Sequence, residues 1–178
     1  ELNKLAGQKI ALLGLGLDNQ ALLLLLDKKN IPAEITICDK RTKKRLDLPI
    51  LKNIKLNYQL GTNFNKELNK FDILFRSPGW PLFCPGVVEA IKDSKTKLSS
   101  PLNIFFALCP SEKIIGVTGT KGKGTTASLI YEMLKANKKS VFLGGNIGIA
   151  PLSFLEKIQP NDYVVLELSS FQLEDLEH

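Results

Sequence analysis

The feature that most constrains the fold of this chain is the glycine-rich run GVTGTKGKGTT, Gly116 to Thr126. An apolar run, Ile114 to Thr118, leads into it, and a helical pattern from Thr125 to Ala136 follows. Glycines in such a loop let backbone N–H groups turn toward phosphate oxygens, and the N-terminus of the helix adds partial positive charge. Lys123 can reach the terminal phosphates. The run therefore predicts a strand, a loop and a helix that bind a nucleotide polyphosphate.

The loop departs from the general GxxxxGK[ST] pattern. Its spacing is TGxxGK, and Gly124 stands where a Ser or Thr would bind magnesium. The alternative is a glycine-rich connection that binds nothing, but the strand and helix on either side favour the phosphate loop.

Short apolar runs and helical patterns alternate along the chain, and Pro110-Ser111 divides them into two groups. The expected strands are Lys9–Leu13, Glu34–Cys38, Ile54–Leu56, Phe71–Phe75, Ile114–Thr118, Val141–Leu143 and Tyr163–Glu167. The expected helices are Gln20–Lys29, Pro85–Lys92, Pro101–Leu108, Thr125–Ala136 and Leu152–Ile158. Such alternation is typical of α/β proteins with parallel sheets. We predict a Rossmann-like parallel-sheet domain at 1–110 and part of a P-loop α/β ATPase domain at 111–176.

Polar and glycine-rich segments follow the later strands. GGNIG, Gly144 to Gly148, and ELSSFQ, Glu167 to Gln172, each come directly after an apolar run. Ligands of parallel sheets bind at the carboxyl ends of the strands, so both segments should lie beside the phosphate loop. Glu167 could coordinate Mg²⁺, or it could be a helix-capping or ion-paired acid.

The N-terminal GLGLDN begins like a dinucleotide-binding fingerprint. Asp39 follows this motif at about the separation in sequence expected of a ribose-binding acid, but Asn19 occupies the place of the third glycine. The motif is weak support for NAD, and a tight turn for helix packing is the alternative.

Composition argues against several classes of protein. The net charge of +6 comes mostly from lysines that are scattered along the chain, which favours a solvated surface over nucleic-acid binding. The longest apolar run, Ala21 to Leu26, is too short to span a membrane. Cys38, Cys84 and Cys109 show no CxxC spacing, so we expect reduced thiols and a cytoplasmic protein.

Both ends of the chain look designed for expression. It begins at Glu1 without Met, and residues 177–178 resemble the start of a histidine tag, so His178 is excluded from functional reasoning.

Taken together, several motifs point to one family. GLGLDN, Asp39-Lys40-Arg41, Ser77-Pro78-Gly79, TGTKGKGTT, GGNIG and ELSSFQL occur here in the order found in the Mur ligases of peptidoglycan synthesis. The sequence resembles that family up to Leu176, and most closely its D-glutamate-adding members. GGNIG and ELSSFQL are far more specific than the phosphate loop alone.

The resemblance implies an ATP-dependent amide ligase of cell-wall synthesis that uses Mg²⁺. The γ-phosphate would pass to the carboxylate of UDP-N-acetylmuramoyl-L-alanine, and the amine of D-glutamate would attack the acyl phosphate. We expect a cytoplasmic monomer without nucleic-acid or membrane partners. Another Mur ligase with a different amino acid, or a nucleotide-binding module without chemistry, are the alternatives.

The resemblance also implies roles for individual residues. Lys123 and Glu167 would be catalytic, and Thr125 and Glu167 would hold the metal. The ATP-binding residues would be Gly119, Thr120, Lys121, Gly122, Lys123, Gly124, Thr125 and Thr126. The residues facing the uridine nucleotide would be Leu17, Asp18, Asp39, Lys40, Arg41, Ser77, Pro78, Gly79 and Asn146.

Three positions depart from the family pattern. Lys121 replaces a common Asn, Gly124 removes the usual metal-binding hydroxyl, which Thr125 could supply, and Asp18 puts an acid where a Ser or Thr commonly meets the diphosphate. The family's central domain also continues past ELSSFQL, and a third domain follows it. We therefore expect a truncated chain that binds its ligands without turnover, because positioning and charge stabilisation need the missing parts.

Overall fold

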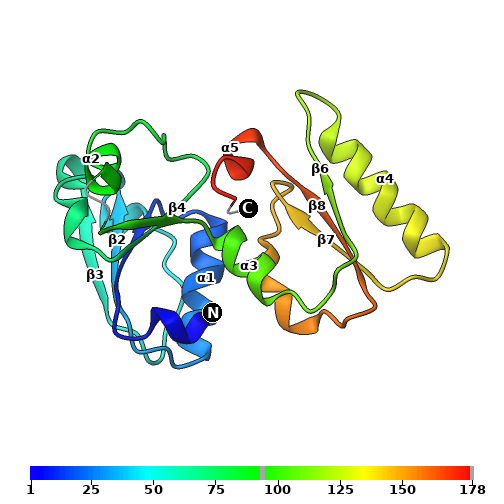
Figure 1. The fold of residues 1–178 in the computed structure, drawn as a ribbon, viewed down its shortest axis with the longest axis horizontal. Helices are drawn as coiled ribbons and strands as arrows, with labels where there is room; N and C mark the ends of the chain where they lie inside the picture. Colours follow the sequence, from blue (N-terminus) through cyan, green and yellow to red (C-terminus); the bar gives the residue numbers. More distant parts are fainter. Residues whose placement is uncertain (93–94, 177–178) are drawn as a thin grey trace.

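The computed structural model describes residues 1–92 and 95–176. Two parallel sheets form its framework (Figure 1). The first sheet has the strand order β3-β2-β1-β4-β5, with every neighbouring pair parallel. Its strands are β1 (Lys9–Leu13), β2 (Glu34–Asp39), β3 (Leu56–Leu60), β4 (Ile73–Arg76) and β5 (Lys97–Ser99).

The second sheet has the order β6-β8-β7 and is also parallel. Its strands are β6 (Ile114–Val117), β7 (Val141–Gly145) and β8 (Tyr163–Glu167). The α-helices are α1 (Leu17–Lys28), α2 (Val87–Lys92), α3 (Pro101–Leu108), α4 (Lys123–Ala136) and α5 (Ser170–Leu173). Short 3₁₀ helices are η1 (Leu2–Leu5), η2 (Lys43–Arg45), η3 (Gly61–Asn63), η4 (Leu68–Lys70), η5 (Pro151–Ser153) and η6 (Leu155–Lys157).

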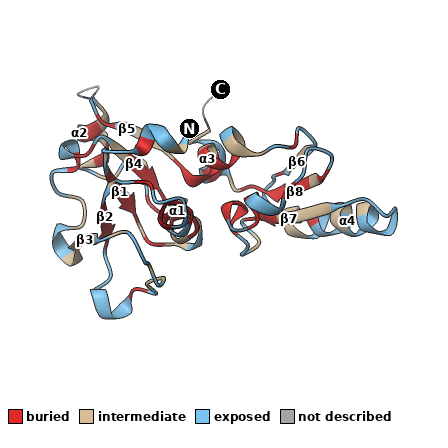
Figure 2. Cartoon of the chain, turned by 90° about the horizontal axis from the view of Figure 1, so that it is seen from below, coloured by how far each residue is buried: buried red, intermediate tan, exposed pale blue. Residues whose placement is uncertain are grey.

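The central strand β1 is apolar and buried from Ile10 to Leu13, because both of its faces are covered there. Ile10 and Leu12 belong to the cluster packed around α1, whereas Ala11 and Leu13 face the cluster that contains Trp80. Figure 2 shows β1, β2 and β4 in the buried colour, as this double covering requires.

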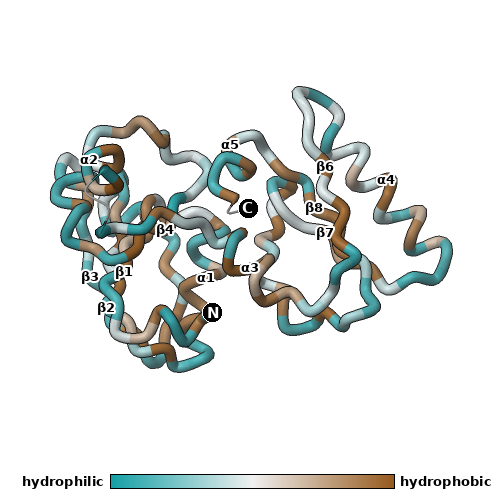
Figure 3. The backbone as a smooth tube through the Cα atoms, in the orientation of Figure 1, coloured by the Kyte–Doolittle hydropathy of each residue, from teal (hydrophilic) through white to brown (hydrophobic). Residues whose placement is uncertain are grey.

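The second sheet is also covered on both faces. α4 packs on one face through Ala127, Ile130 and Leu134. On the other face Phe142 of β7 stacks on Phe154, with ring centroids 5.4 Å apart, and this side joins the core that extends to α1. Figure 3 shows hydrophobic residues gathered on the strands of both sheets. The two sheets therefore share one apolar core across their junction.

Several helices and strands differ in position or type from the expected ones. The third strand lies at Leu56–Leu60, and its mostly half-buried side chains carry little apolar signal. The helix expected at Leu152–Ile158 is two 3₁₀ turns, because Phe154, at φ −117° and ψ 2°, interrupts them. The helix expected from Pro85 begins at Val87, and the short elements β5 and α5 were not expected.

Candidate nucleotide-binding site

Three loops of the first sheet meet at one edge. β1, β2 and β4 run parallel, so the segments after Leu13, Asp39 and Arg76 lie together. The sheet order changes direction at β1, with β2 on one side and β4 on the other, and parallel sheets bind ligands at such a switch point. A pocket of about 240 Å³ lies here. It is lined by Gly14, Gly16, Asp39, Lys40, Arg41, Ser77, Gly79, Trp80 and Pro81.

The GLG turn closes tightly over the loop after β4. Gly14 has φ +79°, and a Cβ there would lie 3.3 Å from Ser77 Cβ. A Cβ on Gly16 would lie 3.1 Å from Ser77 Oγ. Larger residues would push these two loops apart, so both glycines are explained by the close approach of the loops that form the pocket.

Asp39 is fixed by protein donors. Its Oδ2 accepts from the backbone N–H of Leu15 (2.9 Å) and from Arg41 Nη2 (2.6 Å). Its Oδ1 accepts from the backbone N–H and Nε of Arg41, at 2.8 and 2.9 Å. Burial raises the pKa of Asp39, but the hydrogen bonds from Arg41 and Leu15 outweigh it and lower the pKa to about 2. Because both oxygens are engaged, Asp39 is poorly placed to bind the hydroxyls of a ribose, which argues against the NAD interpretation.

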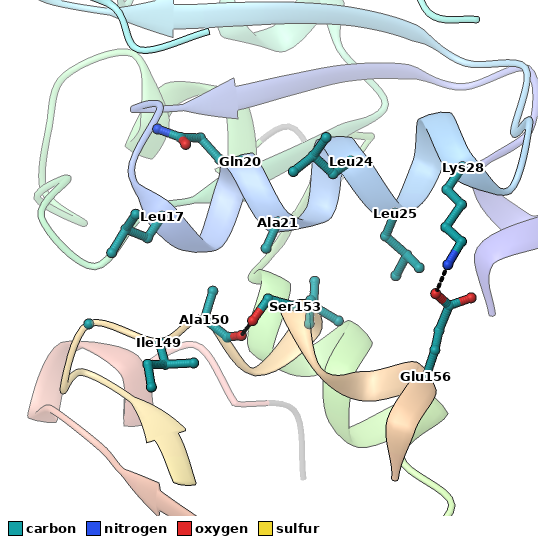
Figure 4. A pocket seen from close by; sticks show the side chains of 12 residues that line it. Leu17, Gln20, Ala21, Leu24, Leu25, Lys28, Ile149, Ala150, Ser153 and Glu156 are labelled. Atoms are coloured by element: carbon teal, nitrogen blue, oxygen red, sulfur yellow. Dashed lines mark hydrogen bonds and ion pairs between the residues drawn. The ribbon is translucent and has the colours of Figure 1, made fainter. Parts of the chain in front are cut away.

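Four of the residues expected at the uridine nucleotide, Leu17, Asp18, Pro78 and Asn146, do not line this pocket. Leu17, which is 57% exposed, instead lines a cavity of about 440 Å³ between α1 and the Gly148–Glu156 segment (Figure 4). Asp18 and Pro78 border a narrow crevice. Burial raises the pKa of Asp18, although a hydrogen bond with Gln172 opposes the shift.

The phosphate loop lies at the carboxyl edge of the second sheet. Gly122 caps α4 in the left-handed conformation, at φ +76°, and no side chain of the described residues hydrogen-bonds to that end of the helix. The loop from Thr118 to Gly122 is exposed. Backbone N–H groups at the start of α4 are therefore available to an anion.

Glu167 lies at the centre of this edge. Its register partners are Val117, just before the phosphate loop, and Gly145 of GGNIG. Oε1 accepts a hydrogen bond from Asn146 Nδ2 (3.1 Å) and lies 3.9 Å from Lys123 Nζ. The edge therefore brings together a lysine, an amide and a carboxylate from three separate motifs.

Close contacts with Glu167 explain the two glycines beside it. A Cβ at Gly124 would lie 3.1 Å from Glu167 Oε2, so the small residue accommodates the carboxylate. A Cβ at Gly145, which has φ +96°, would lie 2.2 Å from the carbonyl oxygen of Glu167. Asn146, expected to face the uridine nucleotide, donates a hydrogen bond to Glu167. The exposed Thr120, Lys121, Thr125 and Thr126 lie on the loop and the first turn of α4.

Sequence reasoning missed several residues beside these two edges. Trp80 and Pro81 line the first pocket, and Arg76, Gln172 and Asp175 surround the crevice beside it. Arg76 could have been found from the charge it places at the end of the otherwise apolar strand before Ser77. Asp175 carried no local signal, because its partner is distant in the sequence.

Both parallel sheets carry glycine-rich loops at their carboxyl edges. The loop at the edge of the second sheet is a phosphate loop, and its Lys123 lies beside the carboxylate of Glu167. These features define a nucleotide-binding α/β protein of the P-loop class. Residues 117–178 match the family described as the Mur ligase middle domain.

Curated relatives extend this match over nearly the whole chain. A UDP-N-acetylmuramoylalanine–D-glutamate ligase of Acetivibrio thermocellus is 44% identical over 172 residues, 96% of this chain and 36% of the relative. Proteins of the same name from Clostridium acetobutylicum and Ruminiclostridium cellulolyticum are each 38% identical over 93% of this chain. They are covered over 36% and 35% of their own lengths. The resemblance to the Mur ligases is thus confirmed, and the chain spans about a third of the relatives it matches.

No helix within the described residues is long and apolar enough to cross a membrane.

Proposed function

We propose that this chain carries the uridine-nucleotide-binding and ATP-binding parts of an ATP-dependent ligase that adds D-glutamate to UDP-N-acetylmuramoyl-L-alanine in the cytoplasm. The observation that supports it most is the register of the second sheet, which sets Glu167 between the phosphate loop and GGNIG. The names of the relatives supply the substrates of the proposal.

ATP would bind through the loop from Gly119 to Thr126. The uncapped start of α4 offers backbone N–H groups and partial positive charge to the phosphates. Lys123, three-quarters buried and 3.9 Å from Glu167, would meet the terminal phosphates with its ammonium group. Its charge would stabilise negative charge on the γ-phosphoryl group as that group moves to the substrate carboxylate.

Magnesium fits the donor chemistry of this edge. Among the described residues no group of three or more His, Cys, Asp or Glu could hold a metal ion. Mg²⁺ in nucleotide enzymes usually takes one or two protein oxygens, and phosphate oxygens and water complete its shell. Glu167 would supply the carboxylate and Thr125 the hydroxyl that Gly124 lacks. When bound, the ion would neutralise phosphate charge.

The uridine nucleotide would occupy the pocket at the first sheet. Arg41 is neutralised by Asp39, so Lys40, which is exposed and lies 5.3 Å from the Phe64 ring centroid, is the better cation for the diphosphate. Ser77 and the backbone of Gly14 and Gly16 would approach the phosphates closely. A Mur ligase adding another amino acid is the remaining alternative, since these residues would not select the incoming amine.

Calorimetric titration of MgATP into the wild-type chain and into Lys123→Met tests the phosphate loop. We expect the variant to bind at least 10-fold more weakly, because it loses the cation that meets the terminal phosphates. Lys135→Met is the matched control, since Lys135 lies in the last turn of the same helix and should leave affinity within twofold. Equal affinity of Lys123→Met and wild type would contradict the proposed ATP site.

A further inference from the structure

Arg76, the last residue of β4, is completely buried. Its Nε donates to both carboxylate oxygens of Asp175, at 3.0 and 2.8 Å. Nη2 donates to the carbonyl oxygen of Phe171 (3.0 Å) and to Glu174 (3.3 Å), and Nη1 donates to the carbonyl oxygen of Trp80 (2.8 Å). One guanidinium from the first sheet is therefore held mainly by the segment that follows the second sheet.

That segment is fixed to the phosphate-loop edge. Leu168, next to Glu167, donates its N–H to the carbonyl of Val117 at 2.8 Å. Ser169 then caps α5 through reciprocal hydrogen bonds with Gln172. Figure 1 shows α5 lying between the two sheets. The position of Asp175 therefore follows the position of the strand that carries Glu167.

The other end of the contact belongs to the uridine-nucleotide pocket. Ser77, directly after Arg76, donates its N–H to the carbonyl of Leu13 (3.0 Å) and packs against the two glycines of the GLG turn. Trp80, whose carbonyl accepts from Arg76, lines the same pocket. A shift of Arg76 would move the loop from Ser77 to Trp80.

A buried guanidinium tolerates few arrangements. Its charge is costly to bury unless fixed acceptors receive its hydrogen bonds, and its planar N–H groups donate only in set directions. The side chain of Asp175 is 3% exposed, and Asn103 Nδ2 holds its carbonyl at 2.7 Å. By contrast, the ion pairs that Glu156 forms with Lys28 and Lys29 are exposed to solvent and constrain the two units weakly. Figure 4 shows the pair with Lys28 at the rim of the cavity.

We propose that Arg76 is a positioning residue that fixes the uridine-nucleotide pocket relative to the phosphate-loop sheet through Asp175. This inference rests on the proposed function for the identity of the ligand, but the arrangement of the two sheets can be measured without any ligand. A residue that only stabilised the fold would change the melting temperature and leave both the arrangement and the affinity of the folded protein unaltered.

The test compares wild type, Arg76→Met, Asp175→Asn, the double variant and Glu156→Gln. Spin labels carried by unnatural amino acids at the exposed positions Lys66 and Glu132 report the distance between the two sheets. Titration with UDP-N-acetylmuramoyl-L-alanine and with MgATP reports each site. Near-ultraviolet circular dichroism identifies folded variants, and the isosteric Asp175→Asn keeps the comparison open if Arg76→Met does not fold.

We expect a narrow distance distribution for wild type and Glu156→Gln, and a broad one for the other variants. The muramoyl nucleotide should bind at least 5-fold more weakly to each single variant, and the double variant should lose no more than the worse single one. MgATP affinity should stay within twofold. Unchanged distances, or broadened distances with unchanged uridine affinity, would overturn the positioning role. If the wild-type chain binds no uridine nucleotide but the variants still broaden the distance distribution, the positioning role stands and the proposed function is refuted.

Discussion

Individual side chains at the sheet edges mainly form hydrogen bonds that connect neighbouring loops, and few of their polar groups are left free for solvent. Asp39 and Arg76 both end strands of the first sheet, and both are buried within networks of hydrogen bonds. Sequence reasoning predicted Asp39 at the nucleotide, and Asp39 lines the pocket at the edge of the first sheet. Sequence reasoning could not foresee that Leu15 and Arg41 take both of its oxygens, because the partner of a carboxylate depends on tertiary structure.

The Asp39 network gives stability a defined dependence on pH. The pKa of Asp39 is about 2 in the folded chain, below its value of about 3.9 in an unfolded one. The unfolded state therefore binds more protons, and the contribution of Asp39 is complete above about pH 4 and lost as pH falls toward 2. We expect this single carboxylate to contribute about 2 kcal/mol at neutral pH.

Urea unfolding of wild type and Asp39→Asn measures that contribution. The variant should be less stable by about 2 kcal/mol at pH 7, and the gap should shrink by at least half at pH 2.5. If the difference in unfolding free energy between wild type and Asp39→Asn stays constant over this pH range, the stabilisation by Asp39 does not depend on its charge.

At the scale of elements, the expectations succeeded wherever burial produced a continuous apolar run. β1, β8 and α3 were predicted at or within a residue of their positions because both faces of the strands, and one face of the helix, are buried. β3 was predicted at Ile54–Leu56 but lies at Leu56–Leu60, and β5 was not predicted. Pairing with β2 and β4 defines these two strands, and their side chains are only partly buried.

GGNIG is the element whose glycines can be tested most cleanly. Gly145 and Gly148 both have positive φ, at +96° and +93°, but only the first faces a close neighbour. A Cβ at 145 would lie 2.2 Å from the Glu167 carbonyl oxygen, whereas nothing lies within 4 Å of one at 148. Gly148→Ala should cost about 1 kcal/mol from backbone strain alone, and Gly145→Ala at least 3 kcal/mol.

Chemical denaturation of the two variants at neutral pH measures the difference. Similar losses of unfolding free energy would mean that the close approach of β7 and β8 at Glu167 does not require glycine.

Across the whole molecule, two sheets contribute separate edges, and a buried arginine and a shared core join them. The fold class was predicted from the alternation of strands and helices, and the glycine-rich motifs indicated the two sheet edges at which we propose that ligands bind. The junction was not predicted, because Arg76 and Asp175 are 99 positions apart and no periodicity connects them.

The central claim is that the edge of the first sheet binds the uridine nucleotide of a Mur ligase. Calorimetric titration with UDP-N-acetylmuramoyl-L-alanine, run beside UDP and NAD, tests it directly. We expect the muramoyl nucleotide to bind, UDP to bind more weakly, and NAD not to bind, since Asp39 is already occupied by Arg41 and Leu15. Preference for NAD, or no binding of either uridine ligand by a folded sample, would contradict the assignment and leave only the phosphate loop.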